Sequence, residues 1–163
     1  MANELEIPDD LKSFLTLKDG EVNLAIVSVV VEPDKKGELI SIAALAEDEI
    51  TKFIVNALAN PQRQSAFEEL VGNQMTFHSK IDALKQLLPE FDQEPKNYQI
   101  HLQFLAALKK LRNTAAHSFG LSTADAIKLR TDTEVVAITL DFPKSAWDRM
   151  ARFRDYLESL IPH

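Results

Sequence analysis

The 163-residue chain contains no cysteine, which excludes disulfide bridges, thiol catalysis and thiolate-bound metal sites. Glycine and proline are scarce, at 4 and 7 residues, and no repeat or low-complexity tract occurs. No apolar run approaches the ~18 residues that a membrane-spanning helix needs, and residues 1–8 lack the basic and apolar regions of a signal peptide. With 45% hydrophobic and 26% charged residues, the composition predicts a soluble globular protein. We expect it to be cytoplasmic and not to bind membranes.

Several motifs of common enzyme classes are missing as well. The chain has no glycine-rich phosphate loop, no Gly-x-Ser-x-Gly and no His-Glu-x-x-His, so nothing supports nucleoside triphosphate hydrolysis, a serine hydrolase or a zinc protease. The four histidines share no metal-binding spacing with one another or with Asp and Glu: His78, His101, His117 and His163. We therefore expect no metal and no cofactor, and we interpret His78 and His101 as packed or surface residues.

Charge is unevenly distributed along the chain, whose net charge is -7. Residues 1–60 hold 12 acidic and 5 basic residues, whereas residues 61–163 hold 13 of each. Residues 107–130 differ from both, because five bases there face only Asp125 and give a local charge of +4. Exposed charges are screened beyond about 10 Å, so a basic site can exist on an acidic protein. The run Glu47-Asp48-Glu49 is interpreted as a solvated acidic face or as charges at the start of a helix.

Apolar residues recur at helical spacing through most of the chain. The pattern is clear from Gly37 to Asn60, continues in a stripe of Phe77, Ile81, Leu84 and Leu88, and returns after Asn97. The third long helix is expected to bury Ile100, Phe104, Leu108, Leu111 and Ala115. A last helix, capped by Ser145, is expected to turn Trp147, Met150, Phe153, Leu157, Leu160 and Ile161 inward. Because the connections are short, we predict an all-α antiparallel bundle of four to six helices.

Two apolar segments leave their secondary structure open. Val22–Val31 fits either a strand or a buried helix, and Val135–Leu140 is a second strand candidate. If both are strands, they are natural partners for a minor two-stranded β-ribbon. A short helix is expected from Asp9 to Gly20, and Ser122 and Asp125 have capping-box spacing for another. We divide the chain into an N-terminal extension, residues 1–36, packed on a bundle domain, residues 37–163.

The stretch most suggestive of chemistry contains Arg112, Asn113 and His117. On an ideal helix Leu108, Leu111 and Ala115 fall within about 40° of Phe104, and Arg112 lies at the flank of this apolar face. Asn113 and His117 are four residues apart and share a ridge roughly opposite the core. Arg112 and His117 are offset by about 140°, so one regular helix would converge them poorly. Unwinding of the helix end, or a second copy in a two-fold dimer, would bring such groups together.

These residue types suit phosphate chemistry. Arginine offers a permanently charged planar fork that matches two phosphate oxygens. Histidine titrates near neutral pH and serves as a general acid or base. Asparagine can orient either group by hydrogen bonding. A structural alternative stays open, in which Arg112 pairs with an acid on a neighbouring helix and His117 interacts with the helix C-terminus.

The pattern Arg112-Asn113-x-x-x-His117 resembles the Arg-polar-x-x-x-His signature of HEPN domains, helical bundles found in prokaryotic toxin–antitoxin and defence systems and in some regulators. The likeness extends to the run Phe77-His78-Ser79-Lys80-Ile81, followed by Leu84 and Leu87, which is similar to the branch related to the mannitol operon repressor. It covers roughly residues 37–130, and the chain before Gly37 is not explained by it.

The resemblance implies a homodimeric, metal-independent endoribonuclease or toxin-like module with the motif at the dimer interface. Arg112 would then hold the scissile phosphate, His117 would assist attack by the ribose 2′-hydroxyl, and Asn113 would orient one of them. Lys109, Lys110 and Ser118 are candidate RNA contacts beside the motif.

A second implication of the same resemblance is a different function class. Relatives of the mannitol operon repressor act as regulators without established nuclease activity, so whether this chain is an enzyme stays open. A non-catalytic interaction protein, with an antitoxin or regulatory protein as partner, is the alternative. Sequence-specific DNA binding is not expected, because no basic recognition helix is apparent.

Overall fold

The computed structural model describes residues 14–15, 20–116 and 121–161, and every structural statement concerns those residues. They form eight α-helices and one 3-10 turn. The elements are α2 (Gly20–Val31), α3 (Pro33–Leu58), η1 (Pro61–Arg63), α4 (Gln64–Gln74), α5 (Phe77–Phe91), α6 (Pro95–Ala116), α7 (Thr123–Arg130), α8 (Thr133–Leu140) and α9 (Lys144–Leu160). The prediction of an all-α helical bundle is therefore confirmed.

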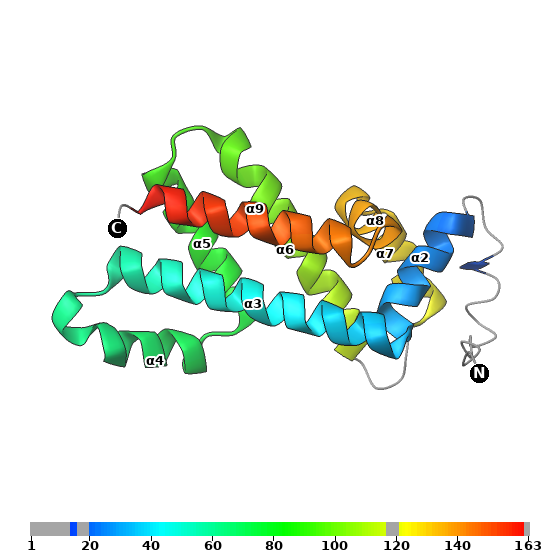
Figure 1. The fold of residues 1–163 in the computed structure, drawn as a ribbon, viewed down its shortest axis with the longest axis horizontal. Coiled ribbons are helices and arrows are strands. Elements are labelled where there is room, and N and C mark those ends of the chain that lie inside the picture. The colour runs from blue at the N-terminus through cyan, green and yellow to red at the C-terminus, as the bar shows by residue number, and fades with distance from the viewer. Residues whose placement is uncertain (1–13, 16–19, 117–120, 162–163) are drawn as a thin grey trace.

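Helix α3 is the centre of the bundle. It packs against α2, α4, α5, α6 and α9, and in Figure 1 it runs beside α9 with α6 crossing behind both. The α4–α5 pair lies at one end of the molecule, and α2, α7 and α8 lie at the other (Figure 1). None of the helices in the described ranges is both long and apolar enough to cross a membrane.

The expected core stripes of two long helices are observed. In α5 all four predicted stripe residues, from Phe77 to Leu88, are buried. In α3 the apolar residues that recur at three- and four-residue spacing are buried as well: Leu39, Ile42, Ala46, Ile50, Phe53 and Ile54. A spacing of three and four residues places these side chains on one helix face, and burial of each large one contributes about 1.5–3 kcal/mol to folding.

The possible β-ribbon does not form in the part of the chain that the structure describes, because both candidate segments are helical. For Val22–Val31 the buried helix, one of the two options left open, is the one observed. The two segments nevertheless lie side by side, since α2 packs against α8. Helix α2 buries Ile26, Val27, Val29 and Val30, which lie on more than one face of the helix. A helix buried on several faces has no polar face, so its sequence does not show the alternation of apolar and polar residues that identifies a helix. The β-branched residues of both segments favour a strand locally, but burial of these segments in the helical bundle outweighed that preference.

Helix α8 begins at a clear cap that the strand interpretation overlooked. The carboxylate of Asp132 accepts hydrogen bonds from the backbone N–H groups of Glu134 at 3.0 Å and Val135 at 3.2 Å. Such a cap satisfies donors that the first helical turn would otherwise leave open. Helix α7 has a similar start, where Ser122 accepts from the N–H of Asp125 as its spacing predicts.

Two stripe positions differ from the prediction in α6 and α9. Ile100 is 57% exposed, and the neighbouring His101 is buried instead. The helix is rotated so that positions 101, 104, 105 and 108 face inward, where the rings of Phe153 and Tyr156 on α9 contact His101. Trp147 is also more exposed than expected, at 37%, and its indole N–H donates to Glu38.

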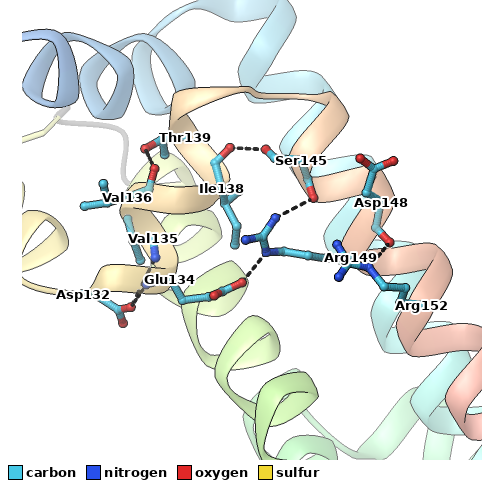
Figure 2. Close-up of polar contacts among 10 residues, drawn as sticks. All are labelled: Asp132, Glu134, Val135, Val136, Ile138, Thr139, Ser145, Asp148, Arg149 and Arg152. Carbon is cyan, nitrogen blue, oxygen red and sulfur yellow. Dashed lines mark hydrogen bonds and ion pairs between the residues drawn. The ribbon is translucent and has the colours of Figure 1, made fainter.

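Ser145 does not cap α9 as predicted. Pro143 occupies the cap position, and the hydroxyl of Ser145 donates to the carbonyl of Ile138 in the last turn of α8 (Figure 2). The C-terminal carbonyls of a helix lack intrahelical donors, so this bond satisfies one of them. It ties the end of α8 to the start of α9.

Residues 20–36 belong to the packed structure. Helix α2 contacts α3, α6, α7 and α8, and α3 runs unbroken from Pro33 through position 37. The helix expected from Asp9 to Gly20 falls mostly outside the described residues. Within it, Phe14 and Leu15 are helical, Phe14 is fully buried, and its carbonyl accepts a hydrogen bond from the amide of Asn23 at 3.0 Å.

Candidate functional site

Arg112 lies in the C-terminal part of α6 and faces α5 and α3. Its guanidinium carbon stands 4.6 Å from the ring centroid of Phe77, in cation–π geometry. One terminal nitrogen, Nη1, is 3.9 Å from Oε2 of Glu47, and the side chain is 29% exposed. The arginine is therefore held in place by an aromatic ring and an acid of another helix, with part of its fork open to solvent.

The same Glu47 carboxylate binds a second cation. Its Oε1 lies 3.1 Å from Nζ of Lys80, whose side chain is only 3% exposed. Lys80 also reaches the carbonyl of Gly72 at 3.5 Å. We name Glu47, Lys80 and Arg112 the Glu47 cluster, which joins α3, α5 and α6. Two cations around one carboxylate leave the cluster with one net positive charge.

Local sequence explains why Lys80 is buried. Thr76 caps α5 by accepting from the N–H of Ser79 at 3.1 Å, which fixes where the helix begins. Lys80 then stands three residues after Phe77 and four before Leu84, so it shares their buried face. A buried ammonium needs an anionic partner, and Glu47 supplies it.

The interpretation of Glu47-Asp48-Glu49 as a solvated acidic face holds for Asp48, whose side chain is 57% exposed, and is wrong for Glu47 and Glu49, at 28% and 14%. Asp48 and Glu49 pair with Lys52 one turn along the same helix, at 3.1 and 3.7 Å. Glu47 instead points to α5 and α6. The signal that could have identified it was Lys80, a charged residue at the spacing of an apolar stripe.

Lys109 and His78 form a second polar contact near Arg112. Nζ of Lys109 lies 2.8 Å from Nδ1 of His78, and Nε2 of that ring lies 3.1 Å from a carboxylate oxygen of Asp82. An ammonium only donates, so Nδ1 accepts and Nε2–H donates to Asp82. The series of polar contacts from Lys109 through His78 to Asp82 lies at the surface and connects α6 to α5. His78 is thus a surface histidine, one of the two interpretations left open.

Lys110 faces the opposite direction, toward the start of α8. Its Nζ is 2.7 Å from Oδ2 of Asp132, the residue that caps that helix. Burial would raise the pKa of Asp132, but the hydrogen bonds from Lys110 and from the backbone of Val135 and Glu134 outweigh it and lower the pKa below its usual value. Asp132 is therefore ionised throughout the neutral range.

The basic stretch of residues 107–130 is partly neutralised in the folded chain. Lys110 pairs with Asp132 and Arg112 with Glu47, and both acids lie outside that stretch of sequence. A hollow of about 320 Å³ also opens beside the Glu47 cluster, and three of its lining residues are acidic: Glu47, Asp48 and Glu68. The field around Arg112 is thus less positive than the local count of +4 implies.

The remaining predicted site residues are placed only in part. Asn113 is exposed next to Arg112 in α6, while His117 and Ser118 lie outside the described residues. Arg112, Lys109 and Lys110 thus lie on one helix but point to three different partners, which are Glu47, His78 and Asp132. Among the described side chains, no three His, Asp or Glu gather in a way that could hold a metal ion.

Comparisons with protein-family models, with curated proteins and with solved structures find no match to this chain.

Proposed function

We propose that this chain is an HEPN-like, RNA-directed protein that acts as a metal-independent endoribonuclease in a homodimer. The observation that carries the proposal is the setting of Arg112. Its guanidinium is fixed over Phe77 near the C-terminal end of a long bundle helix, partly exposed, directly before the exposed Asn113. A fork fixed in advance can bind a phosphate without a large loss of side-chain entropy.

The proposed reaction is attack by a ribose 2′-oxygen on the adjacent phosphorus. A bond forms between the 2′-oxygen and phosphorus, and the bond from phosphorus to the 5′-oxygen breaks. His117 accepts the proton of the 2′-hydroxyl and returns it to the leaving 5′-oxygen, so no other reactant is consumed. Arg112 stabilises the charge that accumulates on the non-bridging oxygens in the transition state. Asn113 orients the phosphate or the imidazole.

The long contact between Arg112 and Glu47 is compatible with this role. At 3.9 Å the pair is at the outer limit of an ion pair and lacks a bidentate geometry. Glu47 also has Lys80 at 3.1 Å, so its charge stays compensated when a phosphate binds Arg112. On one regular helix Arg112 and His117 point in different directions. In a two-fold dimer, the Arg112 of one copy can lie close to the His117 of the other.

The test is cleavage of labelled RNA by the purified chain, with and without EDTA. We expect cleavage that resists EDTA and disappears in His117→Ala and in Arg112→Ala. Arg154→Ala, which removes an exposed arginine from α9, is the matched control and should cleave normally. Cleavage that persists unchanged in the two motif variants would remove those residues from the mechanism.

The second candidate is a non-catalytic regulatory protein of the type related to the mannitol operon repressor. The favouring observation is that Arg112 and Lys110 already have acidic partners, Glu47 of α3 and the cap residue Asp132 of α8. An acidic hollow also lies at Glu47. In this case Arg112 stabilises the bundle, and the chain acts by binding an antitoxin or another regulatory protein. Absence of any cleavage over a wide protein concentration, together with a lower melting temperature in Arg112→Ala, supports this candidate.

We also propose a cytoplasmic location for both candidates. RNA and regulatory partners of this kind are intracellular, which supports this location. Fractionation of cells expressing the tagged chain tests this proposal, and recovery in the medium or an oxidising compartment contradicts it.

A further inference from the structure

His101 differs from the other described histidine in its surroundings. It is only 8% exposed and stacks on Tyr156, with ring centroids 4.6 Å apart at an interplanar angle of 22°. No described residue forms a hydrogen bond with its imidazole nitrogens. An imidazole nitrogen without a partner in the protein can bind a group that enters the groove from solvent.

The imidazole lines a surface groove of about 200 Å³ between α6, α8 and α9. Two arginines of α9 line it as well, Arg149 and Arg152, and α8 contributes Glu134. Ile100 and Phe104 of α6 supply an apolar wall. The groove is thus basic on one side and apolar on the other.

The two arginines are not equivalent. Arg149 donates through Nε to Glu134 and through Nη1 to the carbonyl of Ser145, so its charge is compensated (Figure 2). Arg152 donates through Nε to the carbonyl of Asp148 at 3.3 Å, which leaves its two terminal nitrogens for another partner (Figure 2). The Asp148 carboxylate pairs with Lys144 instead. Within the described ranges, Arg152 has no carboxylate partner.

We propose that this groove binds a phosphate monoester of a small organic molecule, with Arg152 and His101 on the phosphate and Ile100 and Phe104 against the organic part. Arginine donors match phosphate oxygens, and an imidazole N–H adds a donor in a desolvated position. Glu134 does not oppose the ligand, because Arg149 already neutralises it. The exposed Ile100 gains burial when an apolar group covers it.

The site is independent of the function proposed above. His101 and Arg112 are separated by three turns of α6, about 16 Å along the axis at 1.5 Å per residue. Neither Arg112 nor another member of the Glu47 cluster lines the groove. Failure of RNA cleavage therefore leaves this proposal intact, and the reverse is also true.

The experiment follows the NMR signals of the His101 imidazole while phenyl phosphate, inorganic phosphate or, in a separate titration, single-stranded RNA is added to the full chain at neutral pH. The expectations that follow concern the two phosphates. We expect saturable shifts with both, tighter binding of phenyl phosphate, and a loss of at least about tenfold in affinity in Arg152→Ala. Arg154→Ala removes the same charge from an exposed position of the same helix and should bind as the unmodified chain does.

Four outcomes overturn the proposal. They are no saturable shift with phenyl phosphate, equal losses in Arg152→Ala and Arg154→Ala, equal affinity for the two phosphates, and a response to single-stranded RNA without one to phenyl phosphate. The last outcome would assign the groove to a nucleic-acid backbone. Circular dichroism of each variant verifies that the fold is kept.

Discussion

The ammonium of Lys80 lies 3.1 Å from the Glu47 carboxylate. Lys80 stands on the face of α5 that is otherwise formed by buried apolar residues. The same carboxylate stands 3.9 Å from Arg112. One acid on the central helix therefore compensates a buried lysine and faces the arginine of the motif. Any variant of Glu47 acts on both the stability of the bundle and the freedom of Arg112.

Glu47→Gln should lower the free energy of unfolding by about 2 kcal/mol, because it leaves the buried Lys80 ammonium without an anion. The loss is smaller than for a fully buried pair, since the Glu47 side chain is partly exposed. Urea denaturation measures it. Asp48→Asn, next to it on α3 and paired only at the surface with Lys52, is the control and should change stability by less than about 0.5 kcal/mol.

Lys80→Met tests the same pair from the other side. Methionine is apolar and unbranched, so it fills the buried position without needing an anion, and the loss should stay below that of Glu47→Gln. A loss in Lys80→Met larger than that in Glu47→Gln would show that the ion pair itself stabilises the fold.

Arg112→Ala should lower the free energy of unfolding by about 1 kcal/mol, the sum expected of one cation–π contact and one weak ion pair. For a domain of this size the melting temperature falls by about 3 °C. Differential scanning calorimetry provides the measurement, and Lys109→Ala, on the same helix at the surface, should cost less. Because the fold survives, loss of RNA cleavage in Arg112→Ala reports on chemistry.

Asp132→Ala should cost about 1 kcal/mol at neutral pH, since α8 loses its cap. Asp132→Asn keeps an oxygen for the cap and should cost less. Because folding lowers the pKa of Asp132 below 3.8, its charge contributes stability that is complete above that pH and is lost as the pH falls through the folded-state pKa. The difference between the unmodified chain and Asp132→Asn should therefore shrink in acid, as urea titrations at several pH values will show.

His101 should make the bundle less stable as the pH falls below 6.5. Burial, and then the nearby positive charge of Arg152, lower the pKa of His101 in the folded chain, so the unfolded chain binds the proton more readily. The stability it contributes is complete above 6.5 and is lost as the pH falls toward the folded-state pKa. His101→Phe keeps a ring against Tyr156 and should flatten this part of the pH profile.

Arg152→Ala offers a direct check on that cause. Removing the arginine should raise the pKa of His101 toward its ordinary value, with burial still holding it below, in an NMR titration. An unchanged pKa would show that burial alone accounts for the shift.

The helical pattern of the sequence was sufficient where a helix has one apolar and one polar face, as in α5. It failed in α2 and α8, which are short and rich in β-branched residues, because burial on several sides hides the period that separates a helix from a strand. It also missed the rotation of α6. Ile100 and His101 differ by one position, and only the rings of α9 decide which of them is covered.

The types of residue in the candidate site could be predicted from the sequence, but the side chains that pair with them could not. A count of charges along the chain finds the bases of residues 107–130, but the acids that face them, Glu47 and Asp132, come from distant segments. Likewise, the groove at His101 brings α6, α8 and α9 together, and no local spacing indicates it. Charge compensation is a property of the fold, so sequence alone overestimated the basic character of the motif.

The contact between α2 and α8 has a consequence for how the chain is made. Helix α2 is synthesised before α7 and α8, which follow it by about ninety residues and supply part of the surface against which it packs. At ribosomal speeds of about 5–20 residues per second, α2 waits several seconds before that surface emerges. During that interval the nascent chain presents an apolar segment of high β-propensity to its surroundings, and this is the stage at which a chaperone would have most to protect.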